Sequence, residues 1–206
     1  MTGPGGTGKT YITNYVKQGL EDKGLRVALV ESPTRRLADL GYTNNQQSTW
    51  QTQIASGISR QIRQRELEGD LGVDFVLADR AMSCELGYTQ FFVEQQLSRG
   101  LDLFSTLEER DNFSQLLASR DMLRSLWSED TCYYWDYVVF KEIDMNFPPE
   151  SDEHRTSDLE WHLESQKHIR DAFFLHWGDI LPTDRDRASE ELLRKCLEIS
   201  QEKGLL

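Results

Sequence analysis

The 206-residue sequence predicts a single domain with a three-layer α/β/α fold, in which helices cover both faces of a parallel sheet. Three observations lead to this prediction. A glycine-rich segment, GPGGTGKT at residues 3–10, runs directly into an amphipathic helix. Two apolar segments, 25–30 and 73–78, have the length and composition of buried strands. Predicted helices separate the two strands, and strands joined by helices pair in parallel.

Residues 3–10 match G-x-x-x-x-G-K-[ST], the P-loop pattern that binds nucleotide phosphates. Its glycines let backbone N–H groups point inward at an anion, and the helix beginning near Gly8 adds the positive end of its dipole. In this pattern the Lys9 ammonium reaches the β- and γ-phosphates, and the Thr10 hydroxyl binds Mg²⁺. The residues predicted to bind the nucleotide are Gly3, Gly5, Gly6, Thr7, Gly8, Lys9 and Thr10.

A loop of this kind normally follows a buried strand, but here only Met1 and Thr2 precede Gly3. Three interpretations are open: a late start codon, a fragment of a longer chain, or a sheet that forms without this strand. We favour a lost N-terminal strand of about five to six residues, which is the usual strand length.

An amphipathic helix is predicted over residues 11–20 and ends before Gly24, because glycine favours helix C-termini. The strand at 25–30 follows and stops at Glu31. Ligands of open α/β sheets bind at the carboxyl ends of the strands, so Glu31 is expected near the phosphates.

Residues 33–46 have the composition of a loop or broken helix, and a longer helix is predicted over 46–68. Apolar residues recur every four positions along it and predict a narrow buried stripe: Trp50, Ile54, Ile58 and Ile62. Gln47 and Gln51 flank this stripe. They are either solvated polar residues or a pair of amides that hydrogen-bond a substrate base.

The strand at 73–78 ends in Asp79-Arg80. A carboxylate at the end of a buried strand, downstream of a P-loop, is the Walker B arrangement for Mg²⁺. The neighbouring Arg80 is suited to clamp a phosphate. A surface ion pair between Asp79 and Arg80 is the alternative.

The sequence after Arg80 predicts helices over 82–127 with a break near Gly100, and a strand in the second half of 133–140. A helix capped by Ser157, a short edge strand at 180–182 and a helix over 188–203 complete the fold.

An acidic segment with two prolines, residues 143–156, is predicted to form a lid over the site, with Arg155 as its cationic contact.

Composition restricts the partners. The net charge of −12 disfavours a general nucleic-acid binder, which would present a basic face. The three cysteines show no metal-binding spacing and suit a reducing cytoplasm. No apolar run is long enough for a membrane span, so we expect a cytoplasmic protein without a membrane partner, and a homodimer is compatible with the sequence.

Four segments together carry a resemblance to a known family: GPGGTGKT at 3–10, Glu31-Ser32-Pro33-Thr34-Arg35, Asp79-Arg80 and Asp152-Glu153-His154-Arg155. Their order, over most of residues 3–177, resembles the P-loop kinases of small metabolites. It is most similar to the nicotinamide-riboside-kinase-like group, and more distantly similar to thymidylate and deoxynucleoside kinases. That group typically carries an Asp-Asp-Gly-x-Arg-like lid, of which only the Asp and Arg carry over here.

The resemblance implies ATP and Mg²⁺ as cofactors, held by Lys9, Thr10 and Asp79. It further implies that Glu31 accepts the proton of the attacking hydroxyl. By the same resemblance, Arg35 and Arg80 position the acceptor, and Arg155 neutralises charge on the transferred phosphoryl group.

Three functions remain open. The first is a kinase of a nucleoside or nucleotide; the second is a kinase of a hydroxymethylated base in DNA, a role found among phage P-loop kinases. The third is a nucleotide-binding switch without an acceptor. The pair of carboxylates at Glu31 and Asp79 favours the first two, and the acidic composition favours a small acceptor over nucleic acid.

Overall fold

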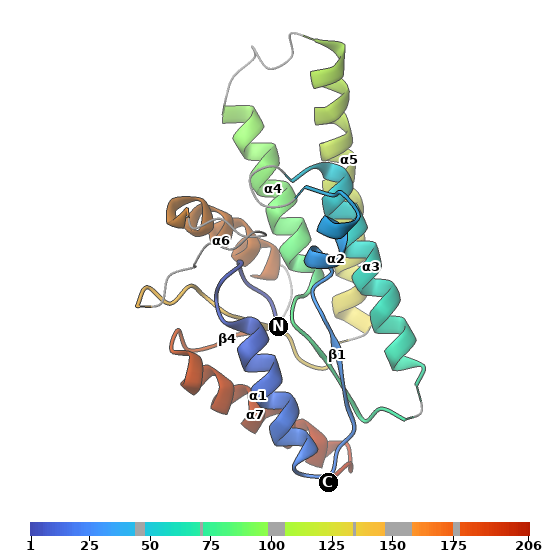
Figure 1. Cartoon of the computed structure of the whole chain (residues 1–206), viewed down its shortest axis with the longest axis vertical. Coiled ribbons are helices and arrows are strands. Elements are labelled where there is room, and N and C mark those ends of the chain that lie inside the picture. Colours follow the sequence, from blue (N-terminus) through green and yellow to red (C-terminus); the bar gives the residue numbers. More distant parts are fainter. Residues whose placement is uncertain (44–47, 71, 99–105, 134, 147–157, 175–177) are drawn as a thin grey trace.

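The fold comes from a computed structural model that describes residues 1–206 apart from 44–47, 71, 99–105, 134, 147–157 and 175–177 (Figure 1). The side chains of residues 35 and 129–133 also lie outside the description. In chain order the elements are α1 (Lys9–Glu21), β1 (Val27–Val30), α2 (Thr34–Asp39), α3 (Trp50–Glu68), β2 (Phe75–Ala78), α4 (Met82–Ser98), α5 (Leu107–Tyr133), β3 (Val139–Phe140), α6 (Leu159–Phe174), β4 (Asp179–Ile180) and α7 (Arg185–Glu202).

The strands form two parallel pairs, β1 with β2 and β3 with β4. Met1 and Thr2 lie between the pairs. The backbone nitrogen of Met1 donates to the Ala78 carbonyl at 2.9 Å, and the nitrogen of Thr2 donates to the Val139 carbonyl at 2.7 Å. The backbone order across the molecule is therefore β1, β2, Met1–Thr2, β3, β4, with every pairing among the strands and the Thr2 bridge parallel.

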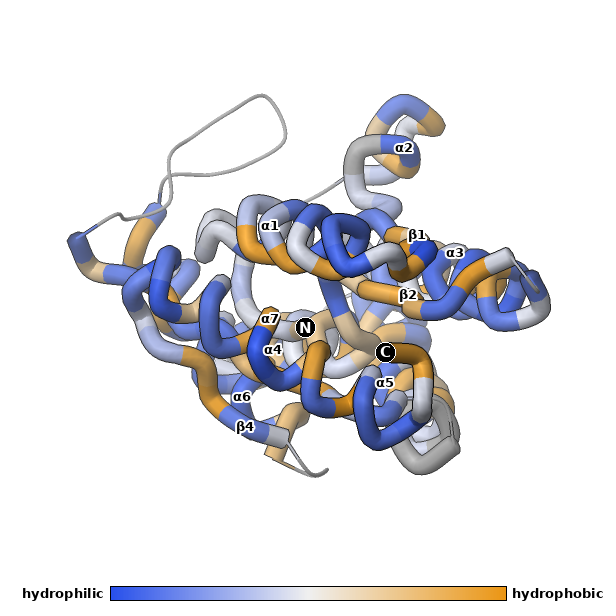
Figure 2. The backbone as a smooth tube through the Cα atoms, turned by 90° about the horizontal axis from the view of Figure 1, so that it is seen from below, coloured by the Kyte–Doolittle hydropathy of each residue, from blue (hydrophilic) through white to orange (hydrophobic). Residues whose placement is uncertain are grey.

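The two faces of the β1–β2 pair pack against different helices. Leu29 and Leu77 belong to an apolar cluster with residues of α1 and α7, which contact each other. Val30 and Ala78, the next residues along each strand, pack with Leu67 of α3. Successive side chains of a strand point to opposite faces, and both faces of this pair are covered, so β1 and β2 are apolar throughout (Figure 2).

Helices α4, α5 and α6 surround the largest apolar cluster, which includes Trp127, Phe140 and Phe173. Helix α4 lies against α6 so closely that a β-carbon on Gly87 would come within 2.4 Å of the Ile169 Cα. Glycine at position 87 thus sets the distance between these helices.

The apolar stripe predicted along α3 is confirmed for Trp50 and Ile54, which are partly buried against the cluster of α4, α5 and α6. It was wrong for Ile58 and Ile62, which are 40% and 55% exposed. The buried face of α3 is largely polar, and its buried residues are Thr52, Gln53, Ser56, Gly57, Arg60, Gln64 and Leu67. Several of these side chains hydrogen-bond partners inside the protein, so hydrophobic periodicity did not identify this face.

Two element boundaries also differ from prediction. Helix α5 continues to Tyr133, which leaves only Val139 and Phe140 of the predicted strand as β3. The N-terminus of α6 is capped by Asp158, whose Oδ1 accepts from the backbone nitrogen of Trp161 at 3.0 Å. The predicted cap, Ser157, lies outside the described residues.

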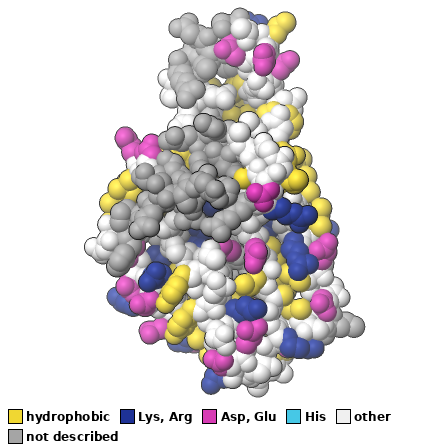
Figure 3. All heavy atoms as spheres, viewed as in Figure 1, with side chains coloured by type: hydrophobic (Ala, Val, Ile, Leu, Met, Phe, Trp, Pro, Cys, Tyr) yellow, Lys and Arg dark blue, Asp and Glu magenta, His cyan; other side chains and the backbone are white. Residues whose placement is uncertain are grey.

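The chain is thus a mixed α/β protein, mostly helical, with a few short parallel strands. On the face in Figure 3, acidic and basic side chains alternate over the lower part of the surface, among the residues drawn in colour. Across the described ranges, none of the helices has the length and apolar character that crossing a bilayer requires.

Candidate functional site

The glycine-rich loop, residues 3–8, turns sharply between Thr2 and α1. Gly3, Gly6 and Gly8 have φ angles of 137°, 78° and 79°, a region that other residues rarely adopt. Gly3 also has no space for a side chain, since a β-carbon would lie 2.2 Å from the Lys141 carbonyl oxygen. Gly8 precedes Lys9, the first residue of α1, so the loop leads directly into a helix N-terminus.

The side chain of Lys9 folds back into this loop. It is only 5% exposed, and its ammonium donates to the Pro4 carbonyl and, at 3.1 Å, to the Thr7 hydroxyl. The Thr7 hydroxyl itself donates to Pro4 at 3.2 Å. The loop therefore encloses a fixed positive charge, as an anion site requires.

Thr10 and Asp79 meet beside the loop. The Thr10 hydroxyl, in the first turn of α1, donates to Asp79 Oδ2 at 2.7 Å, and Asp79 directly follows β2. A hydroxyl and a carboxylate are hard oxygen ligands of the kind that Mg²⁺ prefers. In the described part of the chain, no three His, Cys, Asp or Glu residues cluster.

A cavity of about 720 Å³ extends from the glycine-rich loop toward α3, α4 and α6. Glu31, at the end of β1, lines it and is exposed. The cavity is also lined by residues of the loop, of α1, α3, α4 and α6, and by the two residues after β2: Gly5, Lys9, Thr10, Gln53, Ser56, Asp79, Arg80, Glu85, Tyr88, Phe92, Trp161 and His162.

One end of the loop faces a group of side chains inside this cavity. The backbone nitrogen of Gly5 donates to the Tyr88 hydroxyl at 3.1 Å. A β-carbon on Gly5 would lie 3.8 Å from Arg80 Nη2 and 3.6 Å from His162 Cε1. These distances are ordinary van der Waals contacts, so Arg80, Tyr88 and His162 all lie beside the backbone of Gly5.

The guanidinium of Arg80 has no hydrogen-bond or ion-pair partner among the described residues. Burial by itself lowers the pKa of Arg80, but the neighbouring Tyr88, Cys84, Glu85 and Asp79 outweigh it and raise the pKa above its ordinary value. Arg80 is therefore a permanent cation whose donors are available to an anion in the cavity.

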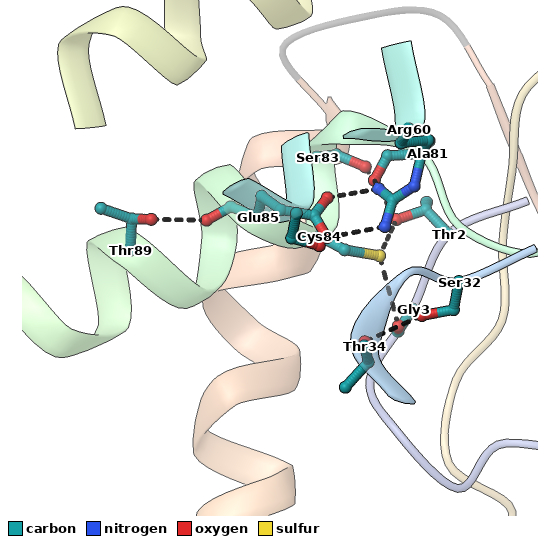
Figure 4. Close-up of polar contacts among 11 residues, drawn as sticks. Thr2, Gly3, Ser32, Thr34, Arg60, Ala81, Ser83, Cys84, Glu85 and Thr89 are labelled. Atoms are coloured by element: carbon teal, nitrogen blue, oxygen red, sulfur yellow. Dashed lines mark hydrogen bonds and ion pairs between the residues drawn. The ribbon is translucent and has the colours of Figure 1, made fainter. Parts of the chain in front are cut away.

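Beneath the cavity, Arg60 of α3 and Glu85 of α4 form a buried ion pair (Figure 4). Both side chains are 2% exposed. Arg60 donates to both carboxylate oxygens of Glu85 and, at 3.1 Å, to the Ala81 carbonyl, while Ser56 donates to Glu85 at 2.9 Å. With both oxygens engaged, Glu85 is held rigidly in the cavity wall, and its charge is balanced within the protein.

Aromatic side chains from α4 and α6 form the facing wall. The Tyr88 and Trp161 rings stack with centroids 5.6 Å apart and planes inclined by 20°. Phe91 meets Trp161 edge-on at 5.7 Å. Phe92 lines the cavity one turn beyond Tyr88. Polar side chains of α3 and aromatic side chains of α4 and α6 thus line the same cavity, which suits a flat polar molecule.

Of the residues predicted for catalysis and metal or phosphate binding, the structure brings Lys9, Thr10, Glu31, Asp79 and Arg80 to this cavity. The remaining glycines and Thr7 form the loop itself, and Gly5, Gly6, Thr7 and Gly8 also line the cavity.

Gln51 does not join them, because it is exposed and absent from the cavity wall; Gln53, two residues later, lines the cavity and is 7% exposed. The backbone of Arg35 belongs to α2, but its side chain is outside the description. Gln47, Arg155 and residues 147–156 of the predicted lid also fall outside the described residues.

The sequence interpretation did not identify Glu85 and Tyr88. One signal was present: Glu85 is the only charged residue in the apolar stretch 81–93. An acidic residue in such a helix requires a buried partner. The matching signal on α3 was the run of polar residues Gln53, Ser56, Arg60 and Gln64, spaced three or four apart.

No protein-family model matches this sequence, and a search of curated proteins finds no match to it. The chemistry of the cavity combines an enclosed lysine, a hydroxyl–carboxylate pair and an arginine that has no partner among the described residues, all around one glycine-rich loop.

Proposed function

We propose that this protein transfers the terminal phosphoryl group of ATP to a nucleoside- or nucleotide-type small molecule, with Mg²⁺ as cofactor. The observation that carries the proposal is the contact between Thr10 and Asp79, 2.7 Å apart, beside the loop that encloses Lys9. A phosphate-binding loop, a cation and a pair of metal ligands in one cavity are the parts that phosphoryl transfer uses.

The arrangement of the strands supports a P-loop fold. The glycine-rich loop follows Thr2, between β2 and β3, and α1 then carries the chain past β2 to β1. Later crossovers lead to strands on the other side of Thr2. The loop therefore lies where the strand order reverses, the position at which open parallel sheets bind ligands.

In this proposal the backbone of the loop and Lys9 bind the phosphates, and Thr10 and Asp79 hold Mg²⁺. The metal ion, when bound, neutralises charge on the phosphate oxygens. Arg80 adds a second cation on the cavity side of the loop. Phosphoryl transfer depends mainly on positioning and on such positive charge, and less on covalent chemistry from the protein.

The acceptor would occupy the part of the cavity beyond the loop. A volume of about 720 Å³ falls within the range typical of small-molecule sites. Glu31 is the proposed general base, since it lies on the cavity wall and its exposed carboxylate can approach an acceptor hydroxyl. Arg35 and Arg155 stay predictions, as contacts to the acceptor and to the transferred group.

Two observations bear on the alternative functions. The net charge of −12 and the mixed charges of the face in Figure 3 favour a small acceptor over duplex DNA. A nucleotide switch would need no acceptor compartment, whereas this cavity continues well past the loop to Gln53 and Phe92.

Nucleotide binding is tested first. Lys9→Ala should weaken Mg-ATP binding by roughly 1.5–3 kcal/mol, the value of a charge-assisted hydrogen bond, measured by calorimetry. Lys17→Ala is the matched control, because Lys17 lies on the same helix and forms an ion pair with the exposed Glu21 at 3.3 Å. Unchanged ATP affinity in folded Lys9→Ala would contradict the proposal.

The acceptor is then sought by incubating the protein with γ-labelled ATP and nucleosides, nucleoside monophosphates or duplex DNA containing hydroxymethylated bases. Label on a small nucleoside or nucleotide supports the proposal. Label on DNA supports the base-kinase alternative, and release of free phosphate without a labelled acceptor supports the switch.

A further inference from the structure

The two ends of the glycine-rich loop face different surroundings. A β-carbon on Gly8 would lie 3.2 Å from Arg185 Cδ, and the Arg185 guanidinium lies over the Tyr11 ring at 4.2 Å. Neither Arg185 nor Tyr11 lines the cavity. A β-carbon on Gly5 would instead approach Arg80 and Tyr88, which do line it. A triphosphate along the loop would thus have its terminal phosphoryl group at the Gly5 end, facing the cavity.

Tyr88 is fixed at the Gly5 end of the loop, and its hydroxyl proton has no acceptor among the described residues. Its oxygen accepts the N–H of Gly5 at 3.1 Å, and stacking on Trp161 holds the ring. A phenol can accept and donate at the same time. Among the residues that the structure describes, the Tyr88 hydroxyl donates to no acceptor. Its proton is therefore available to a group bound in the cavity.

The phenol keeps this proton at neutral pH. Burial raises the pKa of Tyr88, and the opposing effects of Arg80 and of the Gly5 hydrogen bond are smaller. Tyr88 is therefore a neutral donor, and Arg80 beside it is a charged donor without a partner among the residues that the structure describes.

Given the proposed function, on which this inference rests, we propose that Tyr88 is a phosphate-binding residue that donates a hydrogen bond to the terminal phosphoryl group of the nucleoside triphosphate. Gly5 orients the phenol, and Arg80 supplies positive charge to the same group. Together they extend the phosphate site from the glycine-rich loop onto α4, beyond the residues of the loop motif.

The proposal predicts a selective effect of Tyr88→Phe, which removes only the hydroxyl and keeps the ring that stacks on Trp161. Affinities for Mg-ADP and for the Mg complex of a non-hydrolysable ATP analogue are measured by calorimetry. ADP lacks the terminal phosphoryl group, so its affinity should stay unchanged. The ATP analogue should bind about tenfold more weakly, as expected for a lost hydrogen bond to a charged group.

Tyr11→Phe is the matched control. Tyr11 is also a tyrosine beside the loop, but it lies under Arg185 at the Gly8 end. This variant should leave the ratio of the two affinities unchanged. The thermal midpoint of each variant establishes that it is folded.

Each other outcome overturns the inference in a recognisable way. Equal weakening of both nucleotides would mean that Tyr88 only shapes the loop through Gly5. No change for either nucleotide would mean that the hydroxyl does not contact the phosphates. If the unsubstituted protein binds neither nucleotide, the proposed function itself fails, whereas the first two results leave it standing.

Discussion

The hydroxyl of Thr10 lies 2.7 Å from Asp79 Oδ2, although the two residues are 69 positions apart in the chain. One stands in the first turn of α1 and the other directly after β2. The contact connects the helix that follows the glycine-rich loop to the neighbouring strand. Its chemistry depends on the charge of the carboxylate.

Asp79→Asn tests this dependence. The substitution keeps the shape and an acceptor oxygen for Thr10 but removes the charge that attracts Mg²⁺. We expect the Mg²⁺-dependent part of nucleotide affinity to fall on the order of 10- to 100-fold, with metal-free binding little changed. Asp74→Asn is the control, since Asp74 directly precedes β2 at its other end and pairs with Arg26 at 2.7 Å. Equal effects of the two variants on Mg²⁺ dependence would contradict the metal assignment.

Glu31→Gln separates catalysis from binding. If Glu31 takes the proton of the acceptor hydroxyl, turnover should fall roughly 10²–10⁴-fold while ATP affinity stays the same. Steady-state kinetics and calorimetry on one preparation give both quantities. Glu21→Gln, at the far end of α1, should behave as the unsubstituted protein. Loss of ATP affinity in Glu31→Gln would instead place Glu31 among the metal ligands.

The buried pair of Arg60 and Glu85 predicts an asymmetric effect on stability. Arg60→Met leaves the Glu85 carboxylate buried without its counter-charge and should cost about 3–5 kcal/mol, measured by urea unfolding. Arg60→Met combined with Glu85→Leu removes both charges and should recover most of that loss. A single-variant loss below about 1 kcal/mol, the range of surface ion pairs, would show that the pair is not desolvated in solution.

The buried thiol of Cys196 predicts a pH effect. Burial raises the pKa of Cys196 from 9.0 to about 12. The unfolded chain therefore releases this proton first as pH rises above about 9, so the free energy of unfolding should decrease between the two pKa values. The decrease should reach up to about 1.4 kcal/mol per pH unit relative to Cys196→Ala, in which this ionisation is absent. Parallel stability curves for the two proteins over this range would contradict burial of the thiol.

Much of the cavity around the glycine-rich loop was predictable from sequence. The spacing of glycines with Lys9 and Thr10 defines a local motif whose geometry depends on neighbouring residues. Glu31 and Asp79 were predictable from topology, because each directly follows a short apolar segment and parallel strands end at the same edge. The structure brings both carboxylates to the cavity that contains the loop.

The part of the cavity lined by α3 was not predictable in the same way. Periodicity identified α3 as a helix but placed Ile58 and Ile62 in its buried stripe, and both are exposed. The buried face is polar because Ser56 and Arg60 find Glu85 on α4, a partner 25 or more positions away. The hydrophobic pattern of a single helix carries no information about such a partner. Gln53, and not Gln51, lines the cavity, and its amide donates to the Ser48 hydroxyl at 2.7 Å.

Helix α4 runs along the cavity and lines it with residues from successive turns. Glu85, Tyr88 and Phe92 all line the cavity, and the helical rise of about 1.5 Å per residue spreads them over roughly 10 Å. Gly87 packs α4 against Ile169 with no space for a methyl group. This close packing fixes the positions of the three lining residues relative to α6. The cavity can therefore be lengthened by shortening Phe92, or given new polarity there, while the glycine-rich loop at the other end remains as it is. Under the proposed function, substitution at Phe92 would change the size of the molecule that binds without altering the phosphate-binding residues.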